Sequence, residues 1–172
     1  KALAFFYCDY KDSSTHNAST ILGSLARQLI MRHEDCFDNL SIFYQEHISS
    51  DRSIRTPSPE EICQLISQLS THFTAVMIVV DGLDEITHDR AEVSRLLTSL
   101  HTTSSSIKTL FSSRPEVDIG HVLNEFQTIS IAAQSSDIRL YIASEIERRT
   151  ADMRLEINDP PLKEHIMTTL AS

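Results

Sequence analysis

Glycine is scarce in this sequence, and several sequence signals of common protein classes are missing. Only 3 of the 172 residues are glycine, against a usual share of about 7%, and these three are too scattered to form a glycine-rich phosphate loop. Tryptophan is absent and aromatic residues are 6% of the chain, which speaks against a glycosidase that stacks sugar rings. The eight histidines show no H-x-x-x-H or H-E-x-x-H spacing, so zinc-enzyme motifs are not indicated. The longest strongly apolar stretch, residues 75–80, is far too short to cross a membrane.

Positive charge is also in short supply. Fifteen Lys and Arg residues stand against 24 Asp and Glu residues, and the net charge is −9. Nucleic-acid binding needs clustered basic residues, so we expect neither nucleic acid nor membrane as a partner. The three cysteines, Cys8, Cys36 and Cys63, are an odd number without a C-x-x-C pair. They indicate buried thiols in a reducing, cytoplasmic compartment, and we expect Cys8 to pack in the core and not to act as a nucleophile.

Two hydrophobic periodicities alternate along the chain. Short runs rich in apolar residues predict four strands, at residues 3–8, 75–80, 107–111 and 127–131. The first run is apolar throughout, as expected of a strand covered on both faces. Helical spacing between these runs predicts an α/β fold, in which helices flank a parallel sheet.

Two helix starts are marked in the sequence. Ser58-Pro59-Glu60-Glu61 predicts a capping box at the start of a helix. Near the end of the chain, one helix is expected to begin at Ser135 or Ser136 and another at Asp159-Pro160. These last two helices predict a helical C-terminal extension at residues 134–172, behind a core at residues 1–133.

The second predicted strand ends in an acidic segment. Asp81, Asp84 and Glu85 lie within five residues, directly after the apolar run. Chemistry in such sheets sits beyond the carboxyl ends of the strands, where an aspartate is well placed to bind Mg²⁺ and another carboxylate to position a water. The alternative is an acidic turn in which Asp84 or Thr87 caps the next helix.

The third predicted strand ends with an arginine. In Ser112-Ser113-Arg114-Pro115, the proline follows the arginine, and the guanidinium can be directed at a phosphate. The alternative is a surface arginine paired with Glu116. After the first strand, the polar residues Asp9, Lys11 and Asp12 are expected to be solvated.

These motifs resemble a NACHT-type P-loop NTPase of the STAND class of signalling proteins. The apolar run with Asp81-Gly82-Leu83-Asp84-Glu85 resembles that family's extended Walker B motif, and Ser113-Arg114-Pro115 resembles its sensor 1. Residues 3–12 and 21–29 are similar to fungal members with a nephrocystin-like N-terminal NTPase module. The resemblance covers most of residues 1–150.

The resemblance implies a switch that binds ATP or GTP with Mg²⁺, hydrolyses it slowly and drives self-association, linked to effector and repeat domains. Asp81 would be the metal aspartate. Asp84 and Glu85 are both candidates for the catalytic, water-positioning carboxylate, and Arg114 would sense the terminal phosphate. The implied sheet order is 5-1-4-3-2, and the four strands predicted here would be the second to the fifth.

One departure from the family is the missing Walker A motif, G-x-x-x-x-G-K-[ST]. We expect a fragment that lacks the first strand and the phosphate loop, and that is inactive by itself. Two functions stay open at this point. One is part of an NTPase switch, and the other is a catalytically inactive interaction scaffold that keeps the fold.

Overall fold

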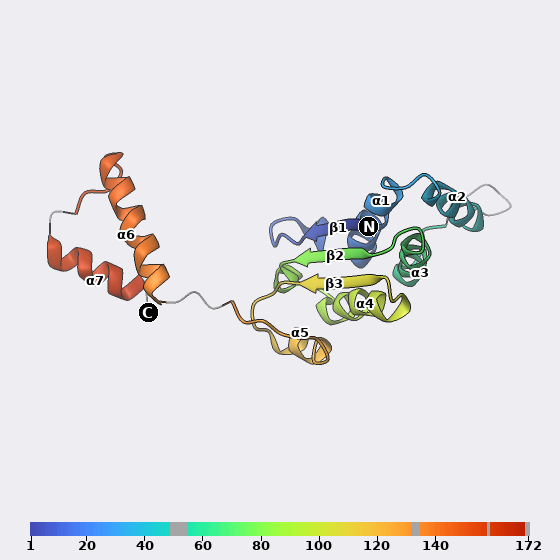
Figure 1. Ribbon diagram of the computed structural model, residues 1–172. Coiled ribbons are helices and arrows are strands. Elements are labelled where there is room, and N and C mark those ends of the chain that lie inside the picture. The colour runs from blue at the N-terminus through green and yellow to red at the C-terminus, as the bar shows by residue number, and fades with distance from the viewer. Residues whose placement is uncertain (49–54, 132–134, 158, 171–172) are drawn as a thin grey trace. The chain divides into compact units, whose positions relative to one another are not determined.

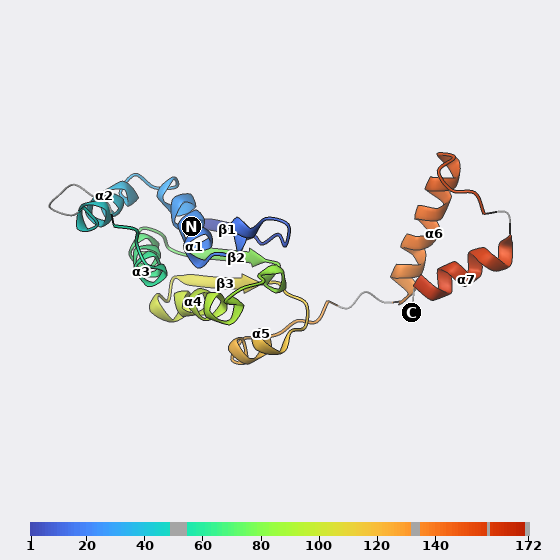
Figure 2. The ribbon, with the colours of Figure 1, turned by 180° about the vertical axis from the view of Figure 1, so that it is seen from behind.

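A parallel sheet of three strands forms the centre of the larger unit of this protein. The computed structural model describes residues 1–48, 55–131, 135–157 and 159–170. The strands β1 (Ala2–Tyr7), β2 (Val76–Asp81) and β3 (Ile107–Phe111) pair in the order β1-β2-β3 and run in the same direction (Figures 1 and 2). The predicted α/β class is therefore confirmed, and the order agrees with the second, third and fourth strands of the implied sheet.

Four helices of the described residues lie in the connections between the strands, and a fifth follows β3. They are α1 (Ala18–Ile30), α2 (Cys36–Glu46), α3 (Pro59–Ser70), α4 (Arg90–Thr103) and α5 (Val117–Val122), with short 3-10 turns η1 (Ser13–His16) and η2 (Leu83–Glu85). Asn17 caps α1, because its side chain accepts hydrogen bonds from the Ser19 and Thr20 backbone N–H groups. The predicted capping box of Ser58 and Glu61 is confirmed at the start of α3.

One face of the sheet carries the core. Helix α1 packs on β1, α4 packs on β3, and α3 contacts both helices. The strands contribute Ala4, Ile78 and Ile107, which are all buried. The largest fully buried side chains that face them belong mainly to the helices: Ile21, Leu22, Leu25, Leu29, Ile66, Leu69, Leu97 and Leu100.

The opposite face of the sheet is open. Leu3, Phe5 and Tyr7 of β1 are 46%, 43% and 64% exposed, and Met77 of β2 and Leu110 of β3 are exposed beside them in register. The prediction that the first strand is covered on both faces is therefore wrong for the described structure. An apolar run shows that a strand prefers burial, but it does not show which faces have a covering element.

The outer edge of β1 is bonded by a side chain. The Gln28 amide on α1 accepts a hydrogen bond from the Phe5 N–H at 3.1 Å and donates one to the Phe5 carbonyl at 2.8 Å. One side-chain amide thus occupies the positions that a neighbouring strand would use.

The predicted strand at residues 127–131 is not formed. These residues pair with no strand in the described structure, and Ile129 and Ile131 are 75% and 94% exposed. In the implied sheet order this segment pairs with the first strand, and none of the three described strands occupies that position. A β-prone segment without a partner for its backbone groups gains little from the extended conformation.

The chain divides into the units Lys1–Phe126 and Gln127–Ser172. The second unit contains α6 (Ser135–Ala151) and α7 (Pro160–Leu170), so helices form where the C-terminal extension was predicted. Arg139 of α6 pairs with Glu164 of α7, and Ile142 and Ile146 are buried. The predicted boundary between residues 133 and 134 falls outside the described residues. Across the described part of the chain, no helix has the length and apolar character that crossing a bilayer requires.

Candidate functional site

The loops that follow β1, β2 and β3 meet at one edge of the sheet, because the strands are parallel (Figure 1). Asp81 is the last residue of β2, and its carboxylate accepts a hydrogen bond from the Ser112 hydroxyl, directly after β3. The same hydroxyl accepts from the Gly82 N–H at 3.1 Å, and the Ser112 carbonyl accepts from the Leu83 N–H at 3.0 Å. Asp81 is therefore held at the strand tip while its side chain stays exposed.

Gly82 makes the sharp turn that follows Asp81. Its φ of 76° lies in the left-handed region. A Cβ at this position would come within 3.1 Å of Glu85 Cγ and 3.2 Å of the Cys8 carbonyl oxygen. The close packing shows that the residue after β1 and the turn η2 approach each other at Gly82.

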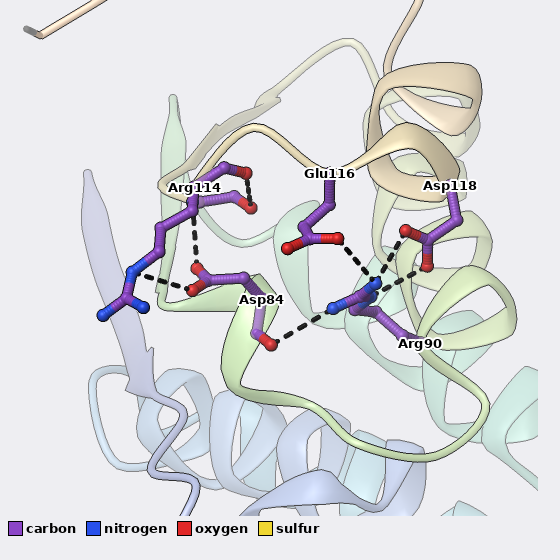
Figure 3. Close-up of polar contacts among 6 residues, drawn as sticks. Asp84, Arg90, Arg114, Glu116 and Asp118 are labelled. Atoms are coloured by element: carbon purple, nitrogen blue, oxygen red, sulfur yellow. Dashed lines mark hydrogen bonds and ion pairs between the residues drawn. The ribbon is translucent and has the colours of Figure 1, made fainter.

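Asp84 and Arg114 form a pair across the ends of β2 and β3 (Figure 3). The Arg114 backbone N–H donates to Asp84 Oδ1 at 3.0 Å, and Arg114 Nε lies 3.5 Å from Asp84 Oδ2. The Asp84 side chain is only 11% exposed, whereas that of Arg114 is 81% exposed. Asp84 thus positions the end of β3, and the Arg114 guanidinium extends into solvent.

The alternatives for these two residues are right about the acidic turn after β2 and the surface position of Arg114, but wrong about the partner of Arg114 and the helix cap. Arg114 pairs with Asp84, while Glu116 pairs with Arg90 at 3.3 Å. Neither Asp84 nor Thr87 caps α4, because the residue at that N-cap is Asp89. Pairing choices of this kind depend on loop conformations, which the local sequence does not reveal.

Arg90 is a second cation beside Asp84 that the sequence analysis missed. Its guanidinium donates to both carboxylate oxygens of Asp118, at 2.8 and 2.7 Å, and to the Asp84 carbonyl at 3.2 Å (Figure 3). The pKa of Asp118 is lowered, chiefly by this hydrogen bonding from Arg90. An open hollow of about 480 Å³ next to Arg90 is lined in part by Asp84 and Asp118. The helix α5, which carries Asp118, is thereby tied to the acidic loop.

Glu85 faces the loop after β1. One of its carboxylate oxygens accepts from the Tyr10 N–H at 3.0 Å. The buried His16 adds a second link, because its Nδ1 lies 3.0 Å from Thr87 Oγ1 and its Nε2 lies 3.0 Å from the Asp9 carbonyl oxygen. Sequence reasoning missed His16, whose only signal is a histidine just before the first helix.

The polar residues after β1 are exposed, as expected. Asp12 also caps η1, and the hydroxyl and backbone N–H of Ser14 lower its pKa. Cys8 follows β1 directly and packs against the core. Burial, with smaller contributions from the nearby carboxylates, raises the pKa of its thiol to about 11, so the thiol stays protonated. This supports the expected packing role.

The four predicted site residues therefore lie at the same edge of the sheet. Asp84 contacts Arg114 directly, and Asp81 is linked to the end of the same strand through Ser112. Glu85 turns the other way, toward the loop after β1. Chemically, the edge offers an exposed carboxylate at a strand tip and an exposed guanidinium on the neighbouring strand end.

One protein-family model matches the part of the chain that contains this edge of the sheet. The family model described as nephrocystin 3, N-terminal, matches residues 1–114. The chain belongs to this family. The matched region begins at β1 and ends at Arg114, so the family region contains all four predicted site residues. No curated protein matches the chain, and no solved structure matches it.

Proposed function

We propose that this chain carries the Mg²⁺-binding and phosphate-sensing part of a nucleotide-dependent NTPase switch. In this proposal it is a NACHT-type module of the STAND class, like the fungal proteins that the sequence resembles, and it works in the cytoplasm. The observation that carries the proposal is the pairing of two adjacent strand ends. Asp81 at the tip of β2 bonds Ser112 at the end of β3, and that end presents the exposed Arg114 guanidinium.

The residues at the tip of β2 fit a magnesium ion. Mg²⁺ is usually held by one or two carboxylates together with waters and substrate phosphates. Asp81 offers an exposed carboxylate, and the hydroxyl of Ser112 is a further hard oxygen beside it. When bound, the ion would neutralise negative charge on the phosphates.

We assign the water-positioning role to Glu85 rather than to Asp84. Both oxygens of Asp84 already face Arg114, and its side chain is largely buried, so Asp84 acts as a positioning residue for the end of β3. Glu85 uses one oxygen on the Tyr10 N–H. Its carboxylate can therefore position a water while it stays anchored to the loop after β1.

The phosphate-binding loop has to come from outside these 172 residues in this proposal, because the sequence contains no G-x-x-x-x-G-K-[ST]. ATP and GTP both fit the observations. The switch would act by changing self-association, or contacts with effector and repeat domains, when nucleotide binds or is hydrolysed.

A second function, an interaction scaffold without catalysis, is favoured by a different observation. The open sheet face presents Leu3, Phe5, Tyr7 and Leu110 to solvent. Contiguous apolar surface of this kind marks interaction sites in many proteins. A scaffold would keep the fold and this surface without any need for Asp81 or Glu85.

Site variants in the protein that carries this region together with a phosphate loop distinguish the two functions. Asp81→Asn should weaken Mg²⁺-dependent nucleotide binding by at least about tenfold, the lower end for changes around a metal. Glu85→Gln should spare binding and slow hydrolysis, whereas Asp12→Asn, a change in the exposed loop after β1, should leave both unchanged. Binding is measured with a fluorescent nucleotide and hydrolysis by phosphate release. A wild-type protein that neither binds nor hydrolyses nucleotide would favour the scaffold, whereas equal, measurable binding and hydrolysis in all four proteins would contradict the roles of Asp81 and Glu85.

A further inference from the structure

Two histidines and an aspartate come together at the edge of the sheet opposite the Asp81 loop. His33 and Asp35 lie between α1 and α2, and His72 follows α3, just before β2 begins. One ligand atom of each residue lies within 4.8 Å of the others. We propose that this cluster binds a divalent transition-metal ion of the zinc class, independently of the nucleotide site.

The distances suit a zinc ion. His33 Nδ1 lies 3.7 Å and His72 Nδ1 lies 3.9 Å from the same oxygen, Asp35 Oδ2. Zinc bonds of about 2.0–2.1 Å in tetrahedral geometry place neighbouring ligand atoms about 3.3–3.4 Å apart. Small side-chain rotations would therefore bring the three atoms onto one ion.

Asn39 orients His72 for this role. His72 Nε2 lies 2.7 Å from Asn39 Oδ1, which only accepts hydrogen bonds, so Nε2 carries a proton. The lone pair of the neutral ring is then on Nδ1, the atom nearer Asp35. A ligand histidine usually donates its other ring N–H to an oxygen in this way, which fixes the tautomer and the ring orientation.

His33 and Asp35 also contribute acceptor atoms to the cluster. The Asp35 backbone N–H donates to His33 Nδ1 at 3.3 Å, so the single lone pair of that ring is on Nδ1 and is directed at this N–H. An ion bound at Nδ1 would replace this long hydrogen bond. Asp35 stands at the N-cap of α2, yet its carboxylate makes no capping bond and lies instead near both histidines. When both rings are unprotonated, the three converging atoms are all hydrogen-bond acceptors and repel one another. A cation bound between them would attract all three.

The cluster is open to solvent, and aromatic rings pack within and against it. The side chains of His33, Asp35 and His72 are 44%, 65% and 24% exposed, so an ion can reach them. The two imidazole rings stack at 5.8 Å between centroids, and Phe73 meets His33 edge-on at 5.9 Å. Three protein ligands leave a coordination position for water or for a ligand from another molecule. Bound metal would join the α1–α2 turn to the end of α3.

Calorimetric titration of the metal-free 172-residue chain with ZnCl₂, in dilute solution and without an affinity tag, tests this proposal. We expect one Zn²⁺ per chain. His33→Gln and His72→Gln should each weaken binding by at least about tenfold, and Asn39→Ala, which removes only the orienting oxygen, by about tenfold. His121→Gln, an exposed histidine on α5, is the matched control and should bind as the wild type does.

Cobalt provides a second readout that separates this site from the cysteines. Co²⁺ bound by nitrogen and oxygen ligands should give visible absorption without a thiolate charge-transfer band, and His72→Gln should abolish it. Circular dichroism checks that the variants stay folded. Zinc uptake that is unchanged in both histidine variants, a thiolate band, or wild-type binding no tighter than that of a His33→Gln/His72→Gln double variant would each overturn the proposal.

Discussion

Gly82 separates the metal-binding candidate Asp81 from Asp84 and Glu85, and its backbone conformation determines where those side chains point. A residue with a Cβ in the left-handed region costs about 1–2 kcal/mol, and here the added atom would also meet Glu85 Cγ at 3.1 Å. The contact with the Cys8 carbonyl at 3.2 Å involves backbone, which yields less easily than the end of a side chain. The residue after Asp81 is therefore constrained by local sterics, whether or not nucleotide is bound.

We expect Gly82→Ala to lower the free energy of unfolding by about 1–3 kcal/mol, the range for a strained backbone conformation. Gly23→Ala is the control, because Gly23 lies within α1 and a Cβ there meets nothing within 4 Å. That change should be neutral or should stabilise by up to about 1 kcal/mol through helix propensity. Urea unfolding followed by circular dichroism measures both, and equal effects of the two changes would contradict the turn geometry.

The start of helix α3 shows which contacts the local sequence predicts and which it does not. The capping box was predictable because Ser58 and Glu61 act on each other within one turn. The contribution of Arg55 was not, because its guanidinium reaches Glu61 only through the path of the preceding loop, with Nη1 3.0 Å from Oε2. Arg55, followed by the Ser58 N–H, lowers the pKa of Glu61 from 4.5 to about 2.

The shift at Glu61 predicts an acid-sensitive helix start. Because the folded pKa is depressed, the stabilisation from Glu61 is fully present above pH 4.5 and is lost as the pH falls toward 2. Glu61→Gln and Arg55→Gln should both flatten the fall in unfolding free energy over this range, while His47, which lies 3.4 Å from Glu61, is left in place. Thermal melts at several pH values measure the slope. A wild-type slope in both variants would show that this contact does not contribute.

The edge strand β1 depends on one side chain from α1. An open strand edge is a template for pairing with other chains, and Gln28 occupies the N–H and C=O groups of Phe5. Gln28→Ala should therefore increase self-association while changing the unfolding free energy little, since water can replace the amide at an exposed edge. Gln64→Ala, at an exposed position on α3, is the control. Light scattering against concentration measures the effect, and equal association of the two variants would count against this edge function.

Strands were predictable where partners are nearby in the fold, and not otherwise. The segment at residues 107–111 formed as predicted, because β2 offers it a continuous ladder. The segment at residues 127–131 has comparable β propensity but no partner strand in the described structure. The composition of a segment does not reveal whether its neighbour in the sheet is present.

For the whole molecule, topology made much of the candidate site predictable. Parallel strands bring their carboxyl ends to one edge, so Asp81 and Arg114 could be placed together from sequence alone. The pairing of Asp84 with Arg114 joins residues 30 positions apart in the sequence, and the link from His16 to Thr87 joins residues 71 positions apart. Both depend on the conformations of loops, which the sequence did not reveal. The His33, Asp35 and His72 cluster joins residues from separate elements, so sequence spacing gave no sign of it.

The open sheet face and the missing phosphate loop point to the same expectation for the chain by itself. Exposed Phe5, Tyr7 and Leu110, with a strand edge at β3, favour aggregation in isolation. Without a loop of backbone N–H groups and a lysine around the phosphates, Asp81 and Arg114 have little to act on. The chain by itself should therefore bind nucleotide too weakly to be measured.

Nucleotide binding, with and without Mg²⁺, tests the central claim most directly. Fluorescent ATP and GTP analogues are titrated into the 172-residue chain and into a longer form of the protein that contains a phosphate loop. The account predicts no measurable binding to the 172-residue chain and Mg²⁺-dependent binding to the longer form, lost in Asp81→Asn. A soluble 172-residue monomer that melts cooperatively and binds ATP with micromolar affinity would contradict it, as would a longer form whose nucleotide binding is indifferent to Mg²⁺ and to Asp81.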